Sequence, residues 1–596
     1  MVEQPGRRST VAAVNLGLYT FGIVGMGPRG SYALECLLAS LADSPHLSRV
    51  RLVLFDDASH VGAGPVYDLD QPESNWINIS ERALELDGRP ALDIDGVHVD
   101  AFPSYHEWVG LPHDEWPADL ADSFPPRAQL GSYLHARAQS LIGPLVQAGV
   151  ATFVEDRVQH VSRLDGRWCL RDTRGREWSA DEVLLTVGHQ PTATDDQIIA
   201  WRETVGPDAK AVLYSEPYPI EPIVDHARML DGDITVAIRG YGLAMMDVVR
   251  GLALEFGEFV RPNDDEGELV YDQTRGGRLQ LVPFSLDGLP MGPKPRTPAD
   301  DARFAPTDEE LTLLGDTLGD RDAQARATSD EFLIDAIVPI AARVFSDLPD
   351  RHEAAPSSID DVESLLGTWL RDADTEHPAL GDAAHPPESV LRELVAMAVG
   401  EASITLDYCL GQVWRQCHPT IYSSLSHNVL SADALAATIS LDERIKRYSF
   451  GPPVESLRQL CALASAGVLR LEFVDDPEIE CTTAGWTLSS NGTTVTAEAM
   501  VDSVLDAPRL ETVVAPVITD LLSESVIRPV HDELGIATDD DATVRSLQPE
   551  ASRTLSVLGR LAKGTVVGVD AILECFGDRP RAWADGARSR LLDSTT

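Results

Sequence analysis

Three glycines, Gly25, Gly27 and Gly30, follow a short apolar run in the sequence FGIVGMGPRG and have the spacing of a phosphate-binding loop. An amphipathic stretch and a second apolar run, RVRLVLFD, come next, and that run ends in Asp56. In such a loop the first glycine permits a tight turn, the second lets the backbone approach a diphosphate, and the third lets helix and strand pack closely. Pro28 suits the first turn of the helix, whose N-terminus directs partial positive charge at the phosphates, and Asp56 stands where a carboxylate accepts hydrogen bonds from a ribose. We therefore expect a bound dinucleotide, the alternative being a chance glycine-rich turn.

A second, degenerate loop follows the apolar run ITVAI, where Gly240 and Gly242 open another amphipathic helix. Met245 occupies the position of the third glycine, and Asp247 lies in the first two turns of the helix, which suits the helix dipole. This pattern predicts a second dinucleotide fold. The alternative is a strand-to-helix turn that binds nothing.

Residues 149–189 and 467–507 form an internal repeat with an offset of about 318 residues. Trp168 and Trp486 stand at equivalent places, and each copy continues through a glycine turn and an alanine-acid pair into an apolar strand. Alternating strands around glycine turns predict a β-meander in each copy, and a helical pattern precedes both. The repeat therefore indicates two related folds in one chain.

These patterns predict an α/β protein with two Rossmann-like dinucleotide-binding folds, two β-meanders and a largely helical insertion. The proline- and acid-rich segment GPKPRTPADDARFAPTDEE that leads into the insertion is typical of a surface linker. The expected division is a first dinucleotide domain, a second domain in two parts around the insertion, and a C-terminal segment that returns to the first domain: residues 1–230, 231–299, 300–450, 451–510 and 511–596.

The bulk composition favours a protein of the cytoplasm. The formal net charge of −47 disfavours nucleic acids and anionic membrane surfaces as partners. The seven cysteines are scattered without a CxxC pair, which disfavours disulfides and a zinc site, and no metal is expected. Arg7 and Arg8 precede an apolar stretch and superficially suggest an export signal, but that stretch runs into the first expected strand. A homo-oligomer remains possible.

Several motifs together resemble the FAD- and NAD(P)-binding flavoproteins, in particular the family that includes FAD-dependent urate hydroxylase-like proteins. They are GMGPRG, GAGPVYD, WINIS, FPPRAQLGSYL, LLTVGHQP, RGYGLAMMDVV, VPFSLDGLPMGPKP and FGPPVESLRQLCALASAGVL, and they span residues 21–510. Amino-acid N-hydroxylases and other flavin monooxygenases with two dinucleotide folds resemble the chain more distantly. The segment 535–564 is similar to the part with which such flavoproteins close over FAD.

The resemblance implies FAD as the ligand of the first fold and NAD(P)H as the ligand of the second. Its implied cofactor-binding residues are Gly25, Gly27, Pro28, Arg29, Gly30, Asp56, Gly64, Tyr67, Asn78, Arg127, Gly188 and Gly559 for FAD, and Gly240 and Gly242 for NAD(P)H. Three of these residues have other possible roles. Tyr67 could be a core tyrosine, Asn78 could simply end a strand, and Arg127 could be a capping or salt-bridging arginine. No catalytic residue is identified, and His189 is a weak candidate for an acid or base because its stretch resembles a cofactor-proximal turn.

The implied activity is an NAD(P)H-dependent monooxygenation of a small molecule with O₂. NAD(P)H would reduce FAD, and the reduced flavin would form a C4a-(hydro)peroxide that passes one oxygen to the substrate. Met245 in place of glycine puts tight nicotinamide binding in doubt. The alternatives are therefore a flavin oxidoreductase without oxygen insertion and a non-catalytic FAD-binding scaffold or sensor.

Overall fold

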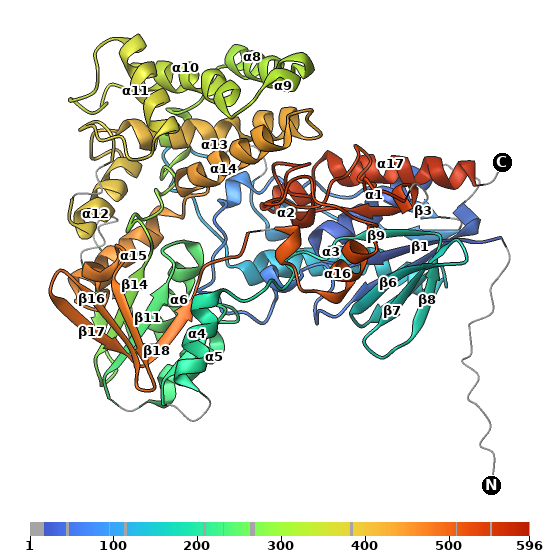
Figure 1. The fold of residues 1–596 in the computed structure, drawn as a ribbon, viewed down its shortest axis with the longest axis horizontal. Helices are drawn as coiled ribbons and strands as arrows, with labels where there is room; N and C mark the ends of the chain where they lie inside the picture. Colours follow the sequence, from blue (N-terminus) through green and yellow to red (C-terminus); the bar gives the residue numbers. More distant parts are fainter. Residues whose placement is uncertain are drawn as a thin grey trace, which may run out of the picture.

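The computed structural model describes residues 17–594 except 43–46, 95, 113–115, 207–209, 231, 263–268, 382–384, 508 and 549–550. Arg7 and Arg8, considered above as part of an export signal, lie outside the described residues. Figure 1 shows one sheet unit at the right, a second at the lower left and a layer of helices at the upper left, above the second unit. Among the described helices, none combines the length and hydropathy that a bilayer crossing requires.

The first unit is built on a parallel sheet with the strand order β19-β9-β1-β2-β5. Its strands are β1 (Tyr19–Val24), β2 (Val50–Asp56), β5 (Ala151–Glu155), β9 (Glu182–Leu185) and β19 (Leu555–Val557). They are apolar along nearly their whole length because both faces of the sheet are covered. One face packs against α1 (Pro28–Leu41), α3 (Arg127–Gln147) and α17 (Asp578–Asp593). The other packs against α16 (Pro516–Ser523) and the meander β6 (Val158–Leu164), β7 (Arg167–Asp172) and β8 (Glu177–Ala180).

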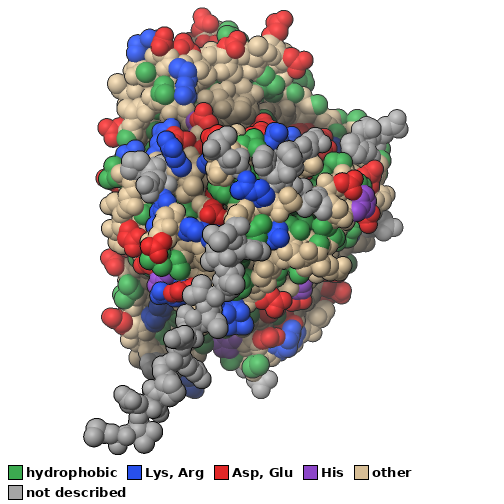
Figure 2. All heavy atoms as spheres, turned by 90° about the vertical axis from the view of Figure 1, so that its right-hand side faces the viewer, with side chains coloured by type: hydrophobic (Ala, Val, Ile, Leu, Met, Phe, Trp, Pro, Cys, Tyr) green, Lys and Arg blue, Asp and Glu red, His purple; other side chains and the backbone are tan. Residues whose placement is uncertain are grey.

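Smaller elements complete this unit between β2 and α3. They are the hairpin of β3 (Leu92–Ile94) and β4 (Val97–Val99) and the short helix α2 (Tyr105–Val109). Figure 2 views the molecule from the side of Figure 1 on which this unit lies, and basic and acidic side chains are interspersed there.

The second unit repeats the topology of the first. Its parallel sheet has the order β10-β18-β11-β14, and the segment from Leu469 to Asp475 adds parallel bridges beyond β14. The positions of β18, β11, β14 and that segment match those of β9, β1, β2 and β5. The strands are β10 (Val212–Tyr214), β11 (Ile234–Arg239), β14 (Leu279–Phe284) and β18 (Ala499–Asp502), and the meander consists of β15 (Glu478–Thr482), β16 (Gly485–Ser490) and β17 (Thr493–Ala497).

Helices cover both faces of this second sheet, and its antiparallel hairpin lies beside them. The helices are α4 (Asp196–Val205), α5 (Glu221–Met229), α6 (Leu243–Phe256) and α15 (Val454–Ser465), and the hairpin consists of β12 (Gly257–Val260) and β13 (Val270–Gln273). Trp168 and Trp486 are 1% and 0% exposed and fill the cores under the two meanders. The predicted α/β class with two parallel sheets and two meanders is confirmed.

The helical layer shares a hydrophobic core with the second sheet. It consists of α7 (Pro298–Ala302), α8 (Asp308–Gly319), α9 (Arg321–Arg326), α10 (Glu331–Asp347), α11 (Ile359–Arg371), α12 (Pro387–Ala398), α13 (Leu406–Leu425) and α14 (Ala432–Ser449). Leu410 and Trp414 of α13 belong to the same buried cluster as Ile238 and Leu281 of the sheet. The insertion is therefore packed against the second unit and is not a loosely tethered module.

The prediction of a surface linker before the insertion is wrong for its first residues. Gly292, Pro293 and Pro295 are buried. The Gly292 N–H donates to the Arg447 carbonyl at 3.0 Å, and the Tyr408 hydroxyl donates to the Pro293 carbonyl at 2.9 Å. Proline and glycine mark irregular backbone, but they do not by themselves reveal that other segments cover it.

Candidate functional site

The first glycine loop joins β1 to α1, and two of its glycines are required by packing. Gly25 has a φ of +93°, and its N–H donates to the Phe55 carbonyl at 2.9 Å. A Cβ on Gly25 would lie 2.5 Å from the Thr186 carbonyl oxygen, and a Cβ on Gly30 would overlap the Gly25 carbonyl oxygen. Both positions therefore exclude larger residues, for the steric reasons expected from the motif.

Gly27 differs from its two neighbours because its Cβ position is open. Among the described residues, Cα of Gly64 at 3.8 Å is the only atom within 4 Å of that position, apart from the chain neighbours of Gly27. Gly27 is the N-cap of α1, Pro28 follows at the first helical position, and no side chain caps this end. Unpaired N–H groups and the positive end of the helix dipole are the features that hold a phosphate group. The absence of a Cβ at Gly27 leaves the space such a group would fill, so these residues fit the diphosphate of a dinucleotide.

Asp56 at the end of β2 holds this loop in place. Its carboxylate accepts hydrogen bonds from the Met26 N–H at 2.5 Å and from the Ala58 N–H at 2.8 Å. Burial raises the pKa of Asp56, against the effect of these backbone donors. Each carboxylate oxygen keeps a second lone pair, to which a ribose hydroxyl could donate a hydrogen bond.

The C-terminal segment lies against the beginning of α1. The Arg29 guanidinium donates to the carbonyls of Glu574 at 3.0 Å and Val569 at 3.2 Å. Gly559 has a φ of +97°, and a Cβ on it would lie 3.0 Å from Nε of Arg29. Arg29 therefore anchors the segment to the loop, and a cofactor contact of Gly559 stays a prediction.

The second glycine loop reproduces the geometry of the first. Gly240 has a φ of +107°, its N–H donates to the Phe284 carbonyl at 2.8 Å, and a Cβ on it would lie 2.6 Å from Oγ of Ser503. Gly242 is the N-cap of α6 without a side-chain cap, and the nearest atom to its Cβ position is Sδ of Met291, at 3.9 Å. Met245 is fully buried in the core. The loop therefore keeps an open helix N-terminus although the third glycine is missing.

A buried ionic network joins the first unit to α6. One oxygen of Asp247 accepts from Arg127 at 2.6 Å and from the Tyr218 hydroxyl at 2.6 Å, and the other accepts from Arg250 at 3.1 Å. The Arg250 guanidinium also lies 4.0 Å from the ring centroid of Trp76. Of the two readings of Arg127, the structure shows the salt-bridging one. Asp247 serves this network, whereas the sequence suggested a role at the helix dipole.

Asn78 of the first unit contacts the segments at the two ends of the helical insertion. Its side-chain amide donates to the Phe450 carbonyl at 3.1 Å, and its own carbonyl accepts from Nζ of Lys294 at 2.6 Å. Lys294 also donates to the Gly451 carbonyl at 2.5 Å, and burial lowers the pKa of this lysine to about 7. Sequence reasoning missed Lys294. The sequence feature that could have singled it out is its setting, because this lysine is one of four in the chain and stands between two prolines in GPKP.

Three other candidates lie around the first unit. Tyr67 packs against a buried cluster that includes Leu130 and Tyr133, which favours its core alternative. Gly188 has a φ of +64° with open space around its Cβ position. His189 is solvent-exposed, yet enclosure by neighbouring atoms and the charge of Arg560 lower the pKa of its imidazole to about 4. An imidazole with a pKa this low is neutral at pH 7 and is a weak base, so the structure adds no support for an acid or base role of His189.

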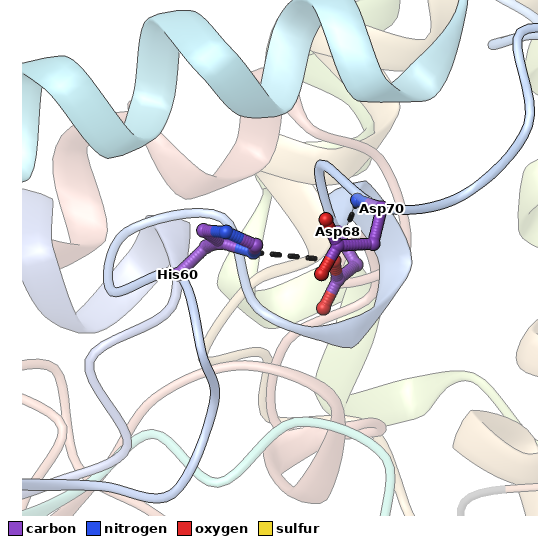
Figure 3. Close-up of side chains that lie close together, drawn as sticks. All are labelled: His60, Asp68 and Asp70. Atoms are coloured by element: carbon purple, nitrogen blue, oxygen red, sulfur yellow. Dashed lines mark hydrogen bonds and ion pairs between the residues drawn. The ribbon is translucent and has the colours of Figure 1, made fainter.

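His60, Asp68 and Asp70 lie together on the loop that follows β2 (Figure 3). Nδ1 of His60 is 3.2 Å from Oδ1 of Asp68, which also accepts from the Asp70 N–H at 2.9 Å. One possible ligand atom of each residue lies within 4.8 Å of the others. The group is partly exposed, and two of its members already bond to each other, so we assign no metal to it.

Comparisons with known proteins agree with this geometry. Residues 22–190 match the family model described as FAD-NAD(P)-binding, which confirms the expected resemblance for the first unit. The chain is 30% identical over 298 residues to the nitrosuccinic acid synthase npaA of Aspergillus oryzae, and 26% identical over 311 residues to the L-aspartate N-monooxygenase (nitrosuccinate-forming) of Streptomyces cremeus. Each match covers 48% of this chain, and it spans only 40% and 42% of the length of these relatives.

One solved structure that matches the chain is that of cyclohexanone monooxygenase from Rhodococcus sp. Phi1 bound to NADP⁺. It has 11% sequence identity and a TM-score of 0.43, and the match covers 96% of this chain and 85% of that one.

Proposed function

We propose that this chain is an FAD-dependent, NAD(P)H-using monooxygenase that oxygenates the amine nitrogen of a small acidic amino acid. The open N-terminus of α1 behind Gly27 carries the cofactor assignment, because it offers unpaired N–H groups beside a space that a side chain would fill. The match of residues 22–190 to an FAD-NAD(P)-binding family supports the same cofactors. The two relatives named for nitrosuccinate formation support an amine nitrogen as the site of oxidation, with L-aspartate as the first substrate to test.

The first glycine loop would hold the diphosphate of FAD against the N-terminus of α1. Gly27 supplies the space, and Asp56 fixes the loop and offers lone pairs to the adenosine ribose. Gly64, which lies opposite Gly27, lets a second segment of backbone approach the same group. When bound, FAD supplies the redox chemistry, accepting a hydride from NAD(P)H and delivering one oxygen atom of O₂ to the substrate.

The second loop would hold NAD(P)H, with Gly242 in the place of Gly27. The contacts of Asp247 with Arg127 and of Asn78 with Phe450 then have a functional meaning, because they hold the two loops at a fixed separation. Hydride transfer depends steeply on the distance between donor and acceptor, so a rigid junction of this kind favours it.

A non-catalytic FAD-binding protein is the second candidate, and Met245 is the observation that favours it. Its side chain fills the third glycine position of the second loop and is fully buried. A third candidate, also an enzyme, is a flavin oxidoreductase that does not insert oxygen.

The test is to incubate the purified chain with FAD, NADPH and L-aspartate under isotopically labelled O₂ and to analyse the product by mass spectrometry. The proposal predicts labelled oxygen on the amine nitrogen and continued, multiple-turnover oxidation of NADPH that depends on both FAD and aspartate. NADPH oxidation without label in the product would identify an oxidoreductase without oxygen insertion. An FAD-loaded chain that NADPH does not reduce would identify the non-catalytic alternative.

A further inference from the structure

A cavity of about 280 Å³ lies where the first unit, the second unit and the helical insertion meet. Asp122 and Phe124 line it from the first unit, and Arg261, at the end of β12, lines it from the second. Pro295 and Arg296 contribute the segment that leads to the insertion. The remaining wall is the first turn of α15, which lies between the second sheet and the helical layer (Figure 1).

Backbone hydrogen bonds between distant segments fix the walls of this cavity. The Asp122 N–H donates to the Arg296 carbonyl at 2.8 Å, and the Arg296 N–H donates to the Ala398 carbonyl at 3.0 Å. The Lys294 N–H donates to the carbonyl of Pro452, just before α15, at 3.1 Å. The cavity is therefore a defined part of the fold and not a gap between mobile side chains.

Three guanidinium groups converge on the cavity, and its two carboxylates already have partners. Arg261, Arg296 and Arg458 line it together with Asp122 and Glu455. Asp122 pairs with Arg82 at 2.8 Å, and Glu455 pairs with Arg261 at 2.6 Å. Three cationic side chains against two carboxylates leave the lining with a net positive charge, which attracts an anion.

Arg458 carries the clearest sign of a missing partner. The residue is 8% exposed, and its Nε atom is buried without a hydrogen-bond partner. Its nearest acid is Glu455, at 3.7 Å, which Arg261 holds more closely. Burial lowers the pKa of Arg458, Glu455 opposes that effect, and the charges of Arg296 and Arg261 add to it. A buried donor left unsatisfied in this way costs free energy that a bound acceptor would recover.

The N-terminus of α15 supplies a second attraction for anions at the same place. Pro453 is the N-cap and provides no side-chain cap, and Pro453, Val454 and Glu455 at this end of the helix line the cavity. The helix dipole adds partial positive charge there.

We propose that this cavity binds the carboxylates of a small dicarboxylate. The volume of about 280 Å³ lies just below the roughly 300–1,000 Å³ of pockets for drug-sized ligands, so it suits a four-carbon acid better than a dinucleotide. Phe124, Pro295 and Val454 form apolar walls that can contact the carbon chain between the two charges. The anionic character of the ligand follows from the cavity alone, whereas its identification as the acidic amino-acid substrate rests on the proposed function.

The test is calorimetric titration of succinate into the FAD-loaded full chain without NADPH. Succinate carries two carboxylates and no amine, so it reports binding without turnover. Arg458→Gln is expected to weaken the binding about tenfold to 100-fold, because a hydrogen bond to a charged group is lost. Arg458→Lys is expected to recover part of the affinity as a point charge. Arg444→Gln is the matched control, since its Nε is also buried without a partner but lies in α14, away from the cavity.

Unchanged FAD absorption in Arg458→Gln would show that this variant is folded. If it does not fold, the succinate titration of Arg458→Lys replaces it. Succinate that binds the Arg458 variants as tightly as the wild type would overturn the proposal. A wild-type chain that binds no succinate would overturn it as well. The proposed function is tested separately by measuring whether NADPH reduces the bound flavin, because that step requires no dicarboxylate.

Discussion

Arg127 and Asp247 form a buried ion pair, 2.6 Å between Nη2 and Oδ2, that joins the first unit to the helix behind the second glycine loop. The two side chains are 15% and 5% exposed, and the second carboxylate oxygen accepts from Arg250. Removing Arg127 takes one charge-assisted hydrogen bond from Asp247, whose charge Arg250 continues to compensate in part.

Arg127→Ala is therefore expected to lower the free energy of unfolding by about 1.5–3 kcal/mol. Arg171→Ala is the matched control, because Arg171 pairs with Glu177 on the surface, where both side chains are more than half exposed. That change is expected to cost less than about 1 kcal/mol. Urea denaturation of both variants measures the difference, and equal losses would contradict a role for the junction.

The first glycine loop predicts opposite consequences for two similar substitutions. Gly27→Val places its side chain in open space beside Gly64, so the stability of the cofactor-free chain is expected to change little while FAD affinity falls at least tenfold. Gly30→Ala forces a Cβ against the Gly25 carbonyl and is expected to cost about 1–3 kcal/mol of stability. Fluorescence titration with FAD and thermal melts of the cofactor-free variants separate the two effects. Unchanged FAD binding by Gly27→Val would contradict the site.

The second loop predicts a separate loss. Gly242→Val fills the open N-terminus of α6, where Sδ of Met291 lies 3.9 Å from the Cβ position, and is expected to abolish reduction by NADPH while FAD stays bound. Stopped-flow absorption without oxygen measures the rate, and chemical reduction with dithionite serves as the control for an intact flavin. Reduction at the wild-type rate would show that NADPH does not use this loop.

The raised pKa of Glu574 predicts that the stability of the fold depends on pH. Burial raises the pKa of this carboxyl from 4.5 to about 7, and its neighbour Asp570 adds to the shift. The folded chain therefore keeps a proton that the unfolded chain releases above about pH 4.5, so the stability this group contributes is full below that value and is lost as the pH rises through 7. Glu574→Gln removes the dependence and is expected to raise the melting temperature at pH 8 relative to the wild type, with little change at pH 5. Equal differences at both pH values would contradict a buried, protonated Glu574.

The fold was largely predictable because its signals are local. Glycine spacing and apolar runs located both loops, and the matching positions of Trp168 and Trp486 revealed the two meanders. These features depend on short-range backbone geometry and on burial, which leave patterns within a few tens of residues.

The junction and the cavity were not predictable in the same way. Arg127 and Asp247 are 120 residues apart, and a single sequence does not indicate which arginine meets which acid. Lys294 stands in a segment typical of a surface linker, and only the packing of other segments around it makes it buried. Arg458 looks like an ordinary polar position of an amphipathic helix until the first unit and the linker close over it.

The central claim is that the loop at Gly27 holds FAD within reach of a nicotinamide held at Gly242. The most direct test is the visible spectrum of the purified chain, reconstituted with FAD, before and after NADPH or NADH is added without oxygen. The account predicts bound oxidised flavin whose absorption is bleached by the reduced nicotinamide. A chain that binds no FAD after reconstitution, or a bound flavin that neither nucleotide reduces, would contradict it.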